Sequence, residues 1–151
     1  MDRAQRAVAL HDNGANCGQA IVCAFSDITG LSEEMGMKVC GTFGGGFRCG
    51  EICGAVSGAG VILGILYPHV EIRDMKAKSF VSKKMMEFER RFLERFPALC
   101  CRDIRDLPVN TEASPTAKRL EVKRSCSVYI AAAAEILEEM IAESGEMGNA
   151  E

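Results

Sequence analysis

The chain has 151 residues, 48% of them hydrophobic and 26% charged, and a net charge of -3. This length and composition predict one domain, residues 1–151, with one core. Basic and acidic side chains are spread along the whole chain, so no basic surface for nucleic acid is expected. The longest nearly apolar run, residues 55–67, is too short to span a bilayer, and the first residues lack the apolar segment of a secretory signal. We expect a cytoplasmic protein with no membrane insertion.

The first third of the chain predicts three helices. Residues 3–12 carry apolar side chains at helical spacing. A second helix is expected to begin at Cys17, because Asn16 is a favourable N-cap and a Gln three positions later completes a capping box, and to end at Gly30. Ser32 is the expected N-cap of a short third helix whose first turn is acidic.

A glycine-rich segment, GTFGGGFRCGEICGAVSGAG, occupies residues 41–60 and matches neither a phosphate-binding P-loop nor a dinucleotide-binding motif. An anion near Gly50 is compatible with the free N–H groups of a helix start. Residues 51–66 predict an apolar helix on which glycines recur every four positions, forming a ridge that another helix could approach closely. The predicted binding surface at this ridge consists of Cys49, Gly50, Gly54 and Gly58.

The second half of the chain predicts two longer helices. Residues 70–96 form the first, which Pro97 ends. Its apolar stripe is interpreted as core and consists of Val81, Met85, Phe88, Phe92 and Phe96. After a loop, the last helix is expected to begin with Ser114 as N-cap and to run to about Ser144. The inward face of that helix is expected to carry Cys126, Tyr129, Ala133, Ile136 and Met140.

No segment shows the sustained alternation of a β-strand. The predicted fold is therefore all-α, a single-domain bundle of five or six helices around the glycine-rich helix, with a frayed tail at residues 143–151. A homodimer contact is compatible with the glycine ridge or with the methionine-rich stretch around Met85 and Met86.

The eight cysteines are the strongest chemical signal in the chain. So many thiols in a reducing compartment indicate metal binding or redox chemistry more often than structural disulfides. No pair has C-x-x-C spacing, so any site must be assembled by the fold. Cys17 and Cys53 are each expected in the first turn of a helix, where the dipole favours a thiolate. Cys101 precedes an arginine, and Cys126 follows one by two positions.

Four quoted segments resemble the C_GCAxxG_C_C family: NCGQA from residue 16, CGAVSG from residue 53, CRDI from residue 101 and CSVYIAAAAEIL from residue 126. This family comprises small bacterial and archaeal proteins whose redox activity is inferred from four characteristic cysteines. The resemblance implies a functional set of Cys17, Cys53, Cys101 and Cys126, on four helical segments. It favours Cys101 over Cys100, because the Arg-Asp-Ile that follows Cys101 fits the pattern. Cys23 and Cys40 lie outside the set, and we interpret them as buried apolar residues.

Three functions are compatible with these residues. The first is a thiol redox centre, a possible thiol-based oxidoreductase, that exchanges electrons with a partner protein or a small thiol, with Cys53 or Cys17 as the thiol of low pKa. In the second, the same four cysteines (Cys17, Cys53, Cys101 and Cys126) ligate zinc or an iron–sulfur cluster. The third is a helical interaction module in which the thiols only pack the core.

Overall fold

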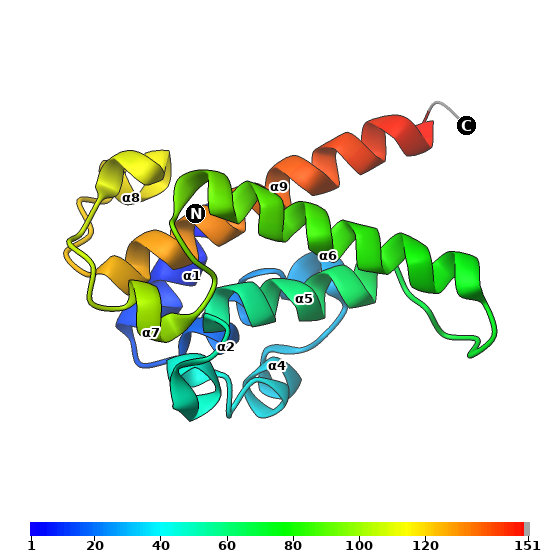
Figure 1. The fold of residues 1–151 in the computed structure, drawn as a ribbon, viewed down its shortest axis with the longest axis horizontal. Coiled ribbons are helices and arrows are strands. Elements are labelled where there is room, and N and C mark those ends of the chain that lie inside the picture. Colours follow the sequence, from blue (N-terminus) through cyan, green and yellow to red (C-terminus); the bar gives the residue numbers. More distant parts are fainter. Residues whose placement is uncertain (150–151) are drawn as a thin grey trace.

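The protein is built from helices, and Figure 1 shows how they are arranged. The computed structural model describes residues 1–149. The α-helices are α1 (Arg3–Asp12), α2 (Cys17–Ala24), α3 (Ser26–Thr29), α4 (Glu33–Val39), α5 (Gly54–Leu66), α6 (Met75–Arg95), α7 (Cys101–Ile104), α8 (Pro115–Arg119) and α9 (Ser125–Asn149). Two shorter helical turns are η1 (Gly46–Gly50) and η2 (Thr111–Ala113). Extended pairing within residues 1–149 is limited to one isolated antiparallel bridge, so the predicted all-α fold is confirmed.

The predicted starts of the early helices are confirmed. Asn16 caps α2 through a complete capping box with Gln19, and Ser32 caps α4 by accepting a hydrogen bond from the Met35 N–H. The second helix is shorter than predicted, because the chain bends at the fully buried Phe25 and resumes as α3. Only α3 reaches the left-handed Gly30 that was expected to end α2.

The glycine-rich helix α5 starts three residues later than predicted. Residues 51–53 are extended instead, because their backbone pairs with residues 99–101. Cys53 therefore occupies the N-cap position rather than the first turn, and Gly50 lies outside the helix with a φ of 76°. The predicted glycine ridge is consequently reduced to Gly54 and Gly58, which face α2.

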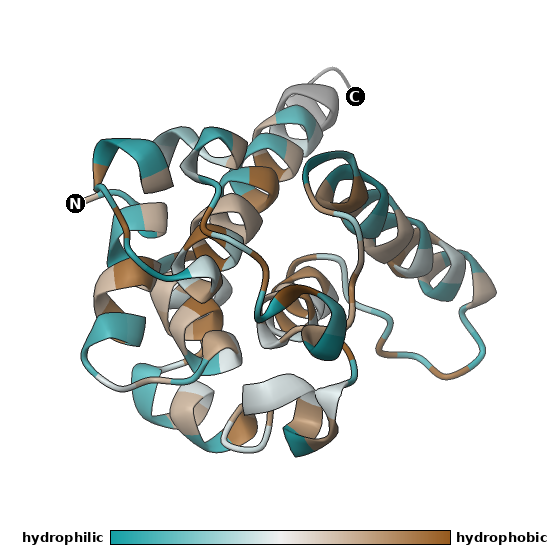
Figure 2. Ribbon diagram, turned by 60° about the vertical axis from the view of Figure 1, so that its left-hand side comes forward, coloured by the Kyte–Doolittle hydropathy of each residue, from teal (hydrophilic) through white to brown (hydrophobic). Residues whose placement is uncertain are grey.

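The long helices α6 and α9 supply much of the core. On α6, Phe88, Phe92 and Phe96 are buried as predicted, while Val81 and Met85 are half-buried. The helix begins at Met75, after Asp74 as its N-cap, so residues 70–74 are not helical as predicted. Figure 2 shows apolar residues where the helices meet and polar residues on the outer face of α6.

The last predicted helix is divided into two. Ser114 and Pro115 begin α8 as expected, but the chain turns at Glu121, which has a left-handed φ of 52°, and α9 starts only at Ser125. The helix then continues to Asn149, past the predicted end at Ser144. The expected frayed tail includes residues 150–151, which lie outside the described residues, and it stays a prediction.

The α5 helix packs against α2, α6 and α9, so the glycine-rich helix has neighbours on several sides. The nine α-helices found within residues 1–149 exceed the predicted five or six, chiefly because α3, α7 and α8 are short separate segments.

Within the same residues, no helix combines the length and the apolar character that crossing a membrane requires.

Candidate functional site

Cys17 is the first residue of α2, and the capping box holds it there. The Gln19 N–H donates to the Asn16 side chain at 2.8 Å, and the Asn16 N–H donates to the Gln19 side chain at 2.9 Å. The Asn16 amide also donates to the Cys40 carbonyl at 2.9 Å, which ties this helix start to the end of α4. Cys17 therefore lies, half-buried, at a helix N-terminus that is held by hydrogen bonds on both sides of the cap.

Cys53 and Cys101 are positioned by the antiparallel bridge between Ile52 and Cys100. The Cys53 N–H donates to the Leu99 carbonyl, and the Cys101 N–H donates to the Glu51 carbonyl, both at 2.7 Å. Side chains alternate between the two faces of extended backbone, so Cys53 and Cys101 share one face while Cys100 points to the other.

Cys126 is the second residue of α9, whose start is anchored to the segment around α7. The Ser125 hydroxyl donates to the Leu107 carbonyl, and the buried Tyr129 hydroxyl donates to the Ile104 carbonyl, each at 2.5 Å. Figure 1 shows the first turns of α5, α7 and α9 on the same side of the molecule. These contacts place Cys126 beside the other three cysteines.

The four side chains form what we call the cysteine cluster: Cys17, Cys53, Cys101 and Cys126. Cys17 interacts most strongly with Cys126, and the charges of Cys53 and Cys101 also act on it. The charges of Cys126 and Cys101 act on Cys53, and the charge of Cys126 acts on Cys101. Residues distant in sequence are thus gathered at one site, although no C-x-x-C pair exists in the chain.

Close approach of α5 to α2 makes this gathering possible. A Cβ atom at Gly54 would lie 3.0 Å from the Cys17 Cβ, and one at Gly58 would lie 3.0 Å from the Gly18 carbonyl oxygen. Both distances are shorter than ordinary contacts. The two glycines let the helix starts that carry Cys17 and Cys53 lie next to each other.

The electrostatics of the cluster single out Cys126 as the thiolate. The hydrogen bond with Cys17 lowers the pKa of Cys126 to about 7; burial opposes this shift, and the Arg124 charge adds to it. The same hydrogen bond, together with burial, raises the pKa of Cys17. The Arg124 cation acts on Cys126, so Cys126 is the sulfur of the pair that carries the thiolate.

The pKa of Cys53 differs from the predicted low value. Burial raises its pKa to about 12, although the N–H groups of Ala55 and Val56 partly oppose that shift. Burial and Cys126 also raise the pKa of Cys101. The prediction that Cys53 or Cys17 has the low pKa is therefore wrong, because desolvation and thiol pairing outweigh the helix N-terminus.

The cluster does not form a preorganised metal site. Among the described residues, no group of three or more His, Cys, Asp and Glu side chains is arranged to hold a metal ion. The histidines are engaged elsewhere: His11 contacts Arg124, and His69 contacts the Ile72 carbonyl. The predicted zinc or iron–sulfur ligation by Cys17, Cys53, Cys101 and Cys126 stays a prediction.

The remaining cysteines divide into buried and exposed ones. Cys23 and Cys40 are buried, as predicted, and Cys23 donates to the Glu33 carbonyl at 3.4 Å. Cys49 is exposed, and Cys100 is half-buried. The sequence analysis did not predict that Cys17 interacts with Cys126, or that Tyr129 joins α9 to α7. The one local signal for Tyr129 is its position three residues after Cys126.

Comparison with known proteins gives one family. A family model described as "Putative redox-active protein (C_GCAxxG_C_C)" matches residues 15–140. Neither the curated proteins nor the solved structures gave a match. The matched region is most of the chain and includes all four residues of the cysteine cluster. The protein therefore belongs to the C_GCAxxG_C_C family.

Proposed function

We propose that this protein is a thiol–disulfide redox protein in which Cys17 and Cys126 cycle between a dithiol and a disulfide. The observation that carries the proposal is the paired thiols, one of which has its pKa lowered to about 7. A thiol with a pKa near neutral pH combines a substantial thiolate fraction with good nucleophilicity.

The exchange proceeds in two steps. The Cys126 thiolate attacks one sulfur of an oxidised partner's disulfide, forms a mixed disulfide and releases the other sulfur as a thiolate. Cys17 then attacks the Cys126 sulfur, giving the Cys17–Cys126 disulfide and releasing the partner's second thiolate, while the Cys17 proton passes to solvent or to that leaving group. Two electrons move from the cysteine pair to the partner, and the reverse sequence reduces the pair.

Cys53 and Cys101 have a different part in this proposal. Because their pKa values are raised, both remain thiols at neutral pH and do not begin the attack. They lie beside the pair and are placed to exchange with its disulfide. The partner is a protein or a small thiol, and the protein then acts as a thiol oxidoreductase.

The test is oxidation of the full chain, purified without oxygen, with a small cyclic disulfide, followed by mass spectrometry of non-reduced peptides. We expect the wild type to form a Cys17–Cys126 disulfide and Cys126→Ser to lose reversible oxidation of Cys17. Cys23→Ser is the matched control, because Cys23 is buried outside the cluster. It should behave as the wild type.

Metal content is measured on the same samples. Stoichiometric iron or zinc that disappears in Cys126→Ser would replace this proposal with a metal centre. A Cys17 and Cys126 pair that stays reduced under conditions that oxidise other thiols would also contradict it.

A further inference from the structure

A surface cavity lies beside the cysteine cluster, at the glycine-rich turn η1. Its volume is about 370 Å³. The residues that line it are Gly45, Arg48, Cys49, Gly50, Arg102 and Arg105. It thus combines three guanidinium groups with one thiol and has no carboxylate in its lining.

The backbone that forms one wall is unusual. Residues 45–48 are all left-handed, with φ angles of 63°, 61°, 57° and 62°. Glycine adopts this conformation readily, whereas each non-glycine residue in it costs about 1–2 kcal/mol. Phe47 and Arg48 nonetheless adopt it, and the turn folds the Arg48 side chain back beside Gly45. Strain of this kind persists where the surrounding structure imposes it, most often at functional sites.

The charges in the cavity are only partly compensated. Arg102 pairs with Glu51 at 2.7 Å, and Arg105 pairs with Asp106 at 3.3 Å, both at exposed positions. Arg48 makes no ion pair with another residue in the described part of the chain. Exposed pairs are weak, so a multivalent anion can compete for all three guanidinium groups.

Cys49 connects this cavity to the cluster. Its thiol is exposed and donates to the Gly46 carbonyl at 3.5 Å. Gly46 also contacts Cys101, since a Cβ atom at Gly46 would lie 2.8 Å from the Cys101 Cβ. Cys49 and Cys101 therefore contact the same residue, one from the cavity and one from the cluster.

We propose that this cavity binds an acidic low-molecular-weight disulfide, one that carries carboxylates, and that Cys49 forms a mixed disulfide with it. Guanidinium forks match carboxylates in geometry and charge. The Cys49 thiol gives its proton to water, its thiolate attacks one sulfur of the disulfide, and the other sulfur leaves as a free thiolate. The ligand is the oxidant, and this step goes beyond the proposed exchange of Cys17 and Cys126 without depending on it.

Two disulfide probes, one anionic and one neutral, test the proposal on the full chain. 5,5′-Dithiobis(2-nitrobenzoate) carries carboxylates, whereas 4,4′-dithiodipyridine is neutral at pH 8. We measure the rate of modification of Cys49 by each probe, assigning the site by peptide mass spectrometry. In the double variant Arg48→Gln/Arg105→Gln, we expect the anionic probe to react about tenfold more slowly and the neutral probe at nearly the wild-type rate.

Arg73→Gln is the control for loss of a positive charge elsewhere, because it removes one guanidinium from the loop before α6, away from the cavity lining. It should leave both rates unchanged. High salt should slow the anionic probe on the wild type and have little effect on the double variant.

Two results would overturn the proposal: equal loss of rate for both probes in the double variant, or modification by the anionic probe that bypasses Cys49. Neither result bears on the Cys17–Cys126 disulfide, which is measured in Cys49→Ser, where it should still form. Failure of this proposal and failure of the proposed function are therefore distinguishable.

Discussion

At Cys126, opposing influences act on one sulfur atom. The hydrogen bond with Cys17 and the Arg124 charge favour the thiolate, and burial disfavours it. Cys53 also lies at a helix start but is almost fully buried, and its thiol is favoured instead. The difference between Cys126 and Cys53 indicates that a helix N-terminus does not by itself lower the pKa of a cysteine whose sulfur is desolvated by burial.

The pH dependence of Cys126 alkylation tests this assignment. Because the thiolate reacts, the rate should rise as pH increases through the lowered pKa of about 7 and level off above it. In Cys17→Ala the midpoint should move up, because the side chain that donates a hydrogen bond to the Cys126 thiolate is removed. The measurement is the iodoacetamide rate at Cys126 by mass spectrometry. A wild-type midpoint near the ordinary value of 9.0 would contradict the assignment.

At the scale of elements, α5 and α2 approach each other through glycine. Gly54 and Gly58 lie against α2, while Gly64 in the same helix has open space around its missing side chain. The helix therefore contains glycines of two kinds, and only the first kind is needed for packing.

Alanine substitutions separate the two kinds. Gly58→Ala should lower the free energy of unfolding by about 1–3 kcal/mol, because its Cβ would crowd the backbone of Gly18. Gly64→Ala, the matched control, should raise it by about 0.5–1 kcal/mol through better helix propensity. Urea unfolding followed by circular dichroism measures both changes. Equal effects of the two substitutions would mean that the close helix approach is absent.

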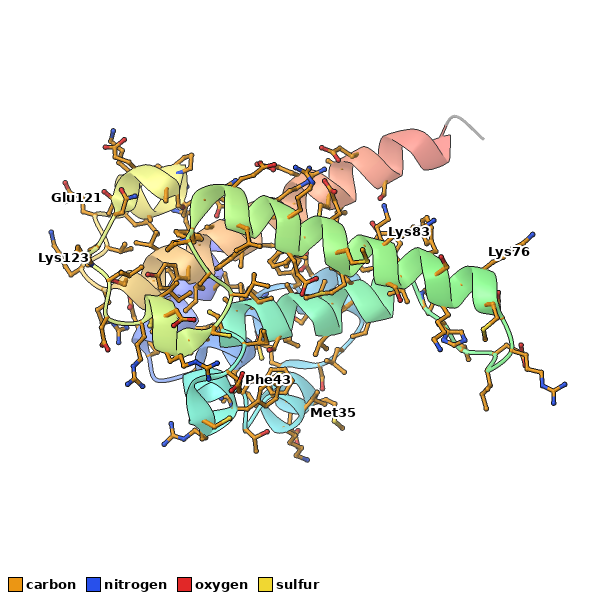
Figure 3. All side chains as sticks on the ribbon, viewed as in Figure 1. Met35, Phe43, Lys76, Lys83, Glu121 and Lys123 are labelled. Atoms are coloured by element: carbon orange, nitrogen blue, oxygen red, sulfur yellow. The ribbon has the colours of Figure 1, made fainter. Side chains whose placement is uncertain are left out.

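At the scale of the whole molecule, the cluster depends on contacts between distant segments. The Ile52–Cys100 bridge joins the start of α5 to α7, and Tyr129 joins α7 to α9. The core around Phe92, Phe96 and Tyr129 supports the same region, since these rings pack against one another. By contrast, Lys76 and Lys83 on the outer half of α6 extend away from the body (Figure 3).

Removal of the Tyr129 hydroxyl should loosen this assembly. Tyr129→Phe leaves the Ile104 carbonyl without its partner, so we expect a loss of about 1–2 kcal/mol in the free energy of unfolding. We also expect faster alkylation of Cys101, because α7 is then held less firmly. Tyr67→Phe is the control, since Tyr67 packs edge-on against Phe80 far from the cluster. Unchanged stability and reactivity in Tyr129→Phe would contradict this role.

Local patterns in the sequence were sufficient for the helix caps at Asn16, Ser32 and Ser114, because capping hydrogen bonds join residues a few positions apart. Local patterns also predicted the all-α class and the burial of Phe88 and Phe92, because the helical spacing of apolar residues can be seen directly in the sequence. The family resemblance likewise needed only the sequence, and it is confirmed by the match over residues 15–140.

The tertiary structure decided where α5 begins and which thiols meet. Residues 51–53 are extended because residues 99–101 pair with them, and no sequence pattern near Cys53 predicts this pairing. The pKa shifts of Cys17 and Cys126 followed largely from burial and from each other's sulfur, although the two residues are far apart in the sequence. Desolvation and charge interactions depend on distance in space, and only the folded chain sets that distance.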